Sequence, residues 1–385
     1  MTRPTYELAG IFRQHGARYR DTHSLPRRQL RVMRAIEICR TAALGGHLDS
    51  CQQCRHTHIS YNSCRNRHCP KCQNRQRAQW LEDRQAELLP VEYFHVVFTV
   101  PEAVAQIAFH NPEIVYALLF RTAAETLLTL AADPRNLGAT LGFFAVLHTW
   151  GQNLLHHPHL HCVIPGGGLS PDKTRWISCR PGFFLPVRML SRLFRRLFVE
   201  ALGQALRKGQ LHSPPEPAQL QALLQIDWVV YAKPPFGGPA RALQYLSRYT
   251  HRVALSNERL VAVDAETVTF QWKDYRHKRK HNSRLMKLAV DEFIRRFLLH
   301  VLPDGFQRIR SFGFLANRHR HANLELCRRL LAHPLSDLLP PPAVCRQPPL
   351  TLVAPPPRCL HCGAALVRLT FLPPYRWPER PPDSS

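Results

Sequence analysis

Acidic side chains are scarce in this sequence. Its 385 residues include 27 Asp and Glu against 52 Lys and Arg, which gives a formal net charge of +25 at pH 7. Such an imbalance favours polyanionic partners, and nucleic acid is the leading one. Charge alone does not separate nucleic acid from an acidic protein or a membrane surface, so the choice among these partners depends on the sequence motifs.

Long hydrophobic runs are also missing. No uninterrupted apolar run approaches the roughly 18 residues of a membrane span, and residues 1–15 lack the apolar core of a secretory signal. We therefore expect a cytoplasmic protein with no membrane partner. Hydrophobic residues still make up 45% of the chain, which allows about two or three domains with at least one sizeable core.

The twelve cysteines suit metal binding better than disulfides in that compartment. Two C-x-x-C pairs flank residues 55–68, and this spacing predicts a four-cysteine zinc ribbon whose strand is formed by residues 56–63. The predicted ligands are Cys51, Cys54, Cys69 and Cys72. The zinc would be structural, because no coordination position stays open. Four further side chains could replace a cysteine or complete a second site: Cys64, His56, His58 and His68.

A third pair, Cys359 and Cys362, lies near Cys345 and His361. By itself it supplies only half of a zinc site. Its surroundings, residues 334–385, are rich in proline and are predicted to be extended or disordered.

Strand and helix patterns alternate from residue 91 onward. Predicted strands lie at 92–100, 142–148, 159–164, 226–232, 252–256, 259–264, 267–274 and 306–312. Predicted helices lie at 111–133, 186–209, 239–250 and 288–302, and two more precede residue 91, at 22–46 and 73–89. This mixture predicts an α+β fold around one largely antiparallel central sheet flanked by helices, preceded by a helical and zinc-ribbon domain. The expected parts are an N-terminal helical and zinc-binding domain (1–90), the sheet domain (91–330) and a proline-rich tail (331–385).

His159 and His161 flank a single apolar residue, Leu160. In a strand, alternate side chains share a face, so both imidazoles would point to one side while Leu160 enters the core. Such a strand can hold a divalent metal, which then needs at least one further protein donor. His148 is the first candidate and Gln152 the second, with a purely structural, hydrogen-bonded His148 as the alternative.

Tyr245 and Tyr249 lie four residues apart on a predicted helix, and therefore on one side of it. A phenol attacks phosphate poorly at neutral pH unless a divalent ion orients the scissile group. Attack would give a phosphotyrosine ester that conserves the bond energy, and the chain has no ATP-binding G-x-x-x-x-G-K-[ST] loop. Arg248 and Arg252 add phosphate-binding groups beside Tyr249.

Residues 272–284 combine cations with Trp272 and Tyr275. Interleaved charges and rings suit single-stranded DNA, through phosphate neutralisation and base stacking. A solvated basic loop is the alternative. The predicted DNA contacts here are Lys273, Arg276, Lys278, Arg279 and Lys280.

Five stretches within residues 20–320 resemble, in order, the two-tyrosine HUH transposases of the insertion sequence 91 family, which move DNA by a rolling-circle route. The stretches are SYNSCRNRHCPKCQ, HTWGQNLLHHPHLHCVIPGGGLS, YLSRYTHRVALSN, FQWKDY and DEFIRRFLLHVLPDGFQRIRSFGFLAN. The resemblance implies a zinc-binding N-terminal domain and an HUH nuclease domain with Mg²⁺ or Mn²⁺ at His159 and His161. It also implies nucleophiles at Tyr249 and Tyr245; single-tyrosine relatives retain the position of Tyr249.

The predicted function is that of a transposase of the bacterial cytoplasm, associated with the nucleoid. It would be a metal-dependent single-strand DNA endonuclease and strand transferase that forms a 5′-phosphotyrosine intermediate at transposon ends and target. A non-catalytic zinc-ribbon nucleic-acid-binding protein would leave the histidines and tyrosines unused, and a metal-dependent hydrolase would leave the tyrosines unused. An HUH replication initiator or relaxase would share the chemistry. The sequence predicts no oligomeric state.

Overall fold

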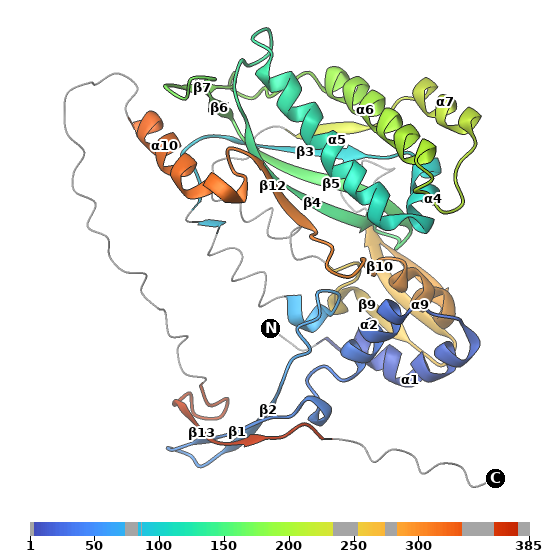
Figure 1. The fold of residues 1–385 in the computed structure, drawn as a ribbon. Helices are drawn as coiled ribbons and strands as arrows, with labels where there is room; N and C mark the ends of the chain where they lie inside the picture. Colours follow the sequence, from blue (N-terminus) through green and yellow to red (C-terminus); the bar gives the residue numbers. More distant parts are fainter. Residues whose placement is uncertain are drawn as a thin grey trace. The chain divides into compact units, whose positions relative to one another are not determined.

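The computed structural model describes residues 4–73, 84–85, 87–233, 253–273, 283–332 and 358–375. The chain divides into two compact units, drawn in Figure 1. The first unit comprises residues 1–73 and 336–385, and the second comprises residues 74–335. The C-terminal residues 358–375 thus belong to the same unit as the N-terminal part.

The second unit is built on a five-stranded sheet in the order β12-β4-β5-β3-β8. All of its neighbouring strands are antiparallel, which confirms the predicted sheet type. Its strands are β3 (Tyr93–Thr99), β4 (Gly142–Trp150), β5 (His156–Pro165), β8 (Val230–Lys233) and β12 (Ile309–Gly313).

Helices cover one face of this sheet (Figure 1). Residues such as Phe98, Leu160 and Phe194 form one continuous core between sheet and helices. The opposite face carries the side chains of alternate residues, including His159 and His161. We call it the histidine face. The covering helices are α4 (Glu102–His110), α5 (Pro112–Ala132), α6 (Val187–Arg207) and α7 (Pro217–Gln225).

Helix α5 passes the test of length and apolar composition for a membrane span, although three charged residues interrupt it. However, 67% of the most apolar 18-residue stretch of this helix is buried inside the protein. Leu119, Leu127 and Ala131 all belong to the core beneath the sheet. Its composition is therefore that of a core helix.

A smaller sheet, β11-β10-β9, lies in the same unit. Strands β9 (Leu260–Val263) and β10 (Thr267–Lys273) fall where strands were predicted, whereas β11 (Ser283–Ala289) was not expected. The predicted strand at 252–256 is wrong for its described part, 253–256, which forms no strand. Helix α9 (Val290–Leu298) follows β11.

This smaller sheet and its helix hold the loop that joins β4 to β5. Arg259 donates a hydrogen bond to the backbone carbonyl of Gln152, and Arg296 donates to that of Asn153. His300 Nε2–H donates to the carbonyl of Leu154 at 3.0 Å. Three charged or polar side chains thus fix the turn beside the histidines. The unit is completed by β6 (Gly167–Leu169), β7 (Trp176–Ser178) and an unexpected helix, α10 (Arg320–Ala332).

The first unit combines helices with a three-stranded antiparallel sheet, β13-β1-β2. Strand β2 matches the strand predicted at 56–63, but β13 comes from the segment expected to be a tail. The elements are α1 (Leu8–Thr22), α2 (Arg27–Glu37), η1 (Ala42–Leu44), β1 (Gly46–Cys51), β2 (Thr57–Tyr61) and β13 (Leu366–Leu372).

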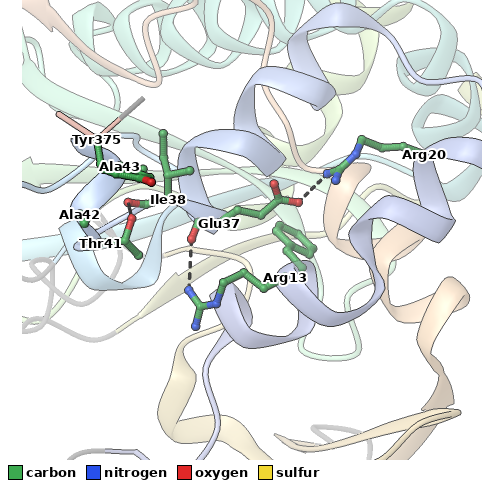
Figure 2. A pocket seen from close by; sticks show the side chains of 9 residues that line it. Arg13, Arg20, Glu37, Ile38, Thr41, Ala42, Ala43 and Tyr375 are labelled. Carbon is green, nitrogen blue, oxygen red and sulfur yellow. Dashed lines mark hydrogen bonds and ion pairs between the residues drawn. The ribbon is translucent and has the colours of Figure 1, made fainter. Parts of the chain in front are cut away.

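A cavity of about 590 Å³ lies beside α1 and α2 in this unit (Figure 2). Arg13 donates to the backbone carbonyl of Glu37, and Arg20 forms an ion pair with its carboxylate at 2.5 Å. Tyr375 also lines the cavity, and its backbone N–H donates to the carbonyl of Ala42 at 3.0 Å. The charged groups of the cavity therefore stabilise the fold of this unit. The hydrogen bond from Tyr375 to Ala42 fixes the C-terminal segment beyond the end of β13.

Candidate metal centres

Three histidines gather on the histidine face of the central sheet. His148 lies on β4 directly opposite His159 on β5, and His161 is two residues further along β5. Their nearest ring nitrogens all lie within 4.8 Å of one another. Leu160, between the two β5 histidines, is fully buried on the helix-covered face. Gln152, the second candidate for a third ligand, lies in the β4–β5 loop.

The ring orientations suit metal binding. The ring of His161 lies 4.5 Å from that of His148 and 4.9 Å from that of His159, each at a steep angle. The Nδ1 atom of His159 is 2.6 Å from the carbonyl of His157. A carbonyl only accepts hydrogen bonds, so Nδ1 carries the proton and the lone pair of His159 is on Nε2. Trp150 stacks on His148 with centroids 4.7 Å apart and supports its ring.

A fourth histidine, His95 on β3, contacts this cluster from the neighbouring strand. Its Nε2 lies 2.8 Å from Nδ1 of His161, and the two rings stack with centroids 5.1 Å apart. Burial lowers the pKa of His95 to about 3, with smaller effects from Lys233 and His159. His95 is therefore neutral at physiological pH. When His161 donates its Nδ1–H to His95, the lone pair of His161 is on Nε2, ready for a metal.

Sequence reasoning missed His95, although a signal was present. The residue stands in the middle of the apolar strand EYFHVVFTV, and a buried polar side chain needs a hydrogen-bond partner. Nothing in the sequence identifies that partner, because the strand that contains it lies more than sixty residues further along the chain.

Within the described residues, eight cysteines form two clusters, where one ribbon was expected. The first contains Cys39, Cys64, Cys69 and Cys72, and the second contains Cys51, Cys54, Cys359 and Cys362. The predicted ligand set Cys51, Cys54, Cys69 and Cys72 is therefore divided between them. The reason is strand pairing: β1 places Cys51 opposite Leu366 of β13, which brings the C-terminal pair alongside.

The first cluster has the donor chemistry of a closed zinc site. Sγ of Cys72 lies 3.6 Å from Sγ of both Cys39 and Cys64. Tetrahedral bonds of about 2.3 Å to zinc would set thiolates about 3.8 Å apart. Hydrogen bonds with Cys64 and Cys69 lower the pKa of Cys39 to about 7, and the same contacts raise the pKa of those two thiols. Of the predicted spare donors, Cys64 joins this cluster, while His56, His58 and His68 belong to neither.

The predicted nucleophiles and most predicted DNA contacts lie outside the described residues. Segment 234–252 contains Tyr245, Tyr249, Arg248 and Arg252, and segment 274–282 contains Arg276, Lys278, Arg279 and Lys280. The structure describes their flanks. Lys273 is exposed at the end of β10, and β8 ends at Lys233, directly opposite His95. The chain therefore leaves the strand next to His95 as it enters the tyrosine segment.

Two family models match the chain. One, described as "Putative transposase", matches residues 142–323, which include His148, His159 and His161. The other, described as "Transposase zinc-binding domain", matches residues 11–100, which include the first cysteine cluster and His95. Together they assign this combination of sheet and zinc-binding unit to the transposases.

Two relatives make the assignment more specific. The chain is 61% identical over 342 residues to "Putative transposase y4qJ" of Sinorhizobium fredii (strain NBRC 101917 / NGR234), covering 86% of this chain and 85% of that protein. It is 28% identical over 345 residues to "Transposase for insertion sequence element IS801" of Pseudomonas savastanoi pv. phaseolicola, covering 86% and 80%. The chain belongs to the insertion sequence 91 family of transposases. No solved structure matches it.

Proposed function

We propose that this transposase is a metal-dependent single-strand DNA endonuclease and strand transferase of the HUH type, acting in rolling-circle transposition at transposon ends and target. The observation that carries the proposal is the cluster of His148, His159 and His161, with His95 hydrogen-bonded to His161. A protein that only binds nucleic acid needs no such cluster. We place its action in the bacterial cytoplasm, at the nucleoid.

The three imidazoles would hold the catalytic divalent ion. Such an ion withdraws charge from the scissile phosphate and orients it for in-line attack. Imidazole nitrogens are borderline donors, whereas Mg²⁺ prefers oxygen ligands and water. Of the two expected ions, the donor set therefore favours Mn²⁺.

Tyr249 and Tyr245 are the proposed nucleophiles. The phenol gives up its proton as its oxygen bonds to phosphorus, the bond from phosphorus to the 3′ oxygen breaks, and the leaving oxygen takes up a proton. The products are a 5′-phosphotyrosine and a free 3′ hydroxyl. Rejoining reverses these steps at a new 3′ hydroxyl and needs no ATP.

The basic side chains at 248–252 and 273–280 are proposed to bind the DNA backbone. Each phosphate contact should release counterions and steepen the salt dependence of binding. A structural zinc at the cysteine cluster of Cys39, Cys64, Cys69 and Cys72 would hold the N-terminal unit in shape. The nuclease chemistry is assigned to residues 91–330.

The test is a denaturing gel of the protein incubated with labelled single-stranded transposon-end DNA and Mn²⁺. We expect a covalent protein–DNA band that chelator abolishes and that His161→Ala strongly reduces. The double variant Tyr245→Phe, Tyr249→Phe should lose the band while retaining DNA binding. A band that survives in this double variant would refute the nucleophile assignment. Retained DNA binding with no band in the wild-type protein would favour a non-catalytic zinc-ribbon protein.

A further inference from the structure

The second cysteine cluster joins the two ends of the chain, and we propose that it is a zinc site of its own. Cys51 and Cys54 come from the N-terminal part, and Cys359 and Cys362 from the C-terminal part. The zinc-binding family model ends at residue 100, so it does not include the second pair. We call this cluster the end-joining site.

The two cysteine pairs adopt the same backbone turn. In turns 51–56 and 359–364, the N–H of the first cysteine donates to the carbonyl five positions on, at 2.9 and 2.7 Å. Its carbonyl accepts from the N–H four positions on, at 2.8 and 2.9 Å. The residue after the second cysteine has a positive φ in both turns, 57° for Arg55 and 75° for Gly363. Arginine rarely adopts this conformation, so a constraint beyond local preference shapes the first turn.

Strand pairing brings these matched turns together. Each turn is followed by a strand that pairs with β1, β2 on one side and β13 on the other. As a result, Sγ of Cys51 lies 3.3 Å from Sγ of Cys362, and Sγ of Cys54 lies 3.6 Å from Sγ of Cys359. All four sulfur atoms lie within 4.8 Å of one another, close to the separation of about 3.8 Å that a tetrahedral zinc imposes.

A single metal ion explains four thiols better than pairwise oxidation does. All four cysteines are free thiols in the structure, although their sulfurs approach closely. Cys51 and Cys359 are buried, whereas Cys54 and Cys362 are exposed. The ion would therefore be enclosed on one side and accessible from solvent on the other.

Zinc at the end-joining site makes the C-terminal segment part of the zinc-binding unit. Residues 74–335 lie in sequence between the two halves of that unit. The metal would therefore link the chain before the histidine-bearing unit to the chain after it. Backbone pairing of β13 with β1 and the hydrogen bond from Tyr375 to Ala42 extend the same link.

Zinc content of the purified full-length chain tests the proposal. Elemental analysis should find two zinc ions per chain, one for each cysteine cluster. The double variant Cys359→Ser, Cys362→Ser should contain one. The matched control His361→Ala changes the same turn outside the cluster and should contain two. One zinc in the wild type, unchanged in the double variant, would overturn the proposal, as would a Cys51–Cys362 disulfide found by mass spectrometry in place of the metal.

Cobalt substitution keeps the test decisive if the double variant folds poorly. Titration of the metal-free wild-type chain should reach the full thiolate-to-cobalt absorption at two equivalents, and saturation at one equivalent would contradict the second site. Neither readout involves DNA cleavage. The proposed zinc at the end-joining site can therefore be refuted while the proposed nuclease activity is supported, and the reverse.

Discussion

The histidine cluster and the cysteine clusters are held in place by different means. The histidines project from β4 and β5, neighbouring strands of a five-stranded sheet with a large core beneath it, and His95 holds His161 from a third strand. The cysteines lie at turns and chain ends around a sheet of only three strands. We therefore expect the first arrangement to persist without metal and the second to depend on zinc. This difference predicts separate responses of the two units.

Zinc removal should have the largest effect. Structural zinc contributes on the order of 10 kcal/mol to small zinc-binding domains, so chelation should unfold the first unit. Hydrogen exchange should show loss of protection in β1, β2 and β13, while β3, β4 and β5 keep theirs. Equal loss in both sheets would mean that the second unit also depends on zinc.

The variant His161→Ala should weaken metal binding in the second unit and leave its fold intact. Loss of a direct ligand should reduce the affinity for Mn²⁺ by more than about 100-fold, the upper range for residues that only support a ligand. The fold should persist, because the core on the helix-covered face is untouched. Isothermal titration with Mn²⁺ and thermal unfolding measure the two effects. A matched control is His157→Ala, on the same strand but outside the cluster; its affinity should stay near that of the wild type.

Mild acid should destabilise the second unit through its buried histidines. Burial lowers the pKa of His300 to about 3 and that of His156 to about 4, against ordinary values of 6.5. Below pH 6.5 the unfolded chain therefore binds more protons than the folded one, and the free energy of unfolding falls as the pH drops toward 4. The loss should reach several kcal/mol.

Exchange protection of β4 and β5 at pH 7 and pH 4.5 measures this effect. His300→Gln should lessen the loss, because one of the buried groups with a lowered pKa is gone. A pH-independent unfolding free energy over this range would contradict the burial of both neutral rings.

Replacement of His95 should give the smallest effect. Because His95 acts through His161, His95→Ala should weaken Mn²⁺ binding by about 10- to 100-fold. His95→Gln, which retains a hydrogen-bonding group, should recover part of the loss. Metal affinity distinguishes this positioning role from a general packing role, since a packing defect would lower the unfolding temperature of both variants without a graded change in Mn²⁺ affinity.

The sequence predicted those parts of the sites whose residues lie close together in the chain. The period of two around Leu160 placed His159 and His161 on one face, and the short connection from β4 to β5 brought His148 opposite His159. It failed where partners are distant. Nothing near Cys51 indicates that β13 pairs with β1, because that contact spans more than three hundred residues. Likewise, β11 was not predicted, and its last two residues, Leu288 and Ala289, were assigned to the helix that follows, because no turn signal separates them from α9.

The most direct test of the nuclease proposal is to identify the residue that carries DNA. Trypsin separates the two tyrosines, because Arg248 follows Tyr245 and precedes Tyr249. After reaction with single-stranded DNA and Mn²⁺, followed by nuclease trimming, mass spectrometry should find the nucleotide on peptide YTHR (249–252) and, less abundantly, on ALQYLSR (242–248). An adduct on any other peptide, or none under conditions in which the DNA is cut, would contradict the mechanism.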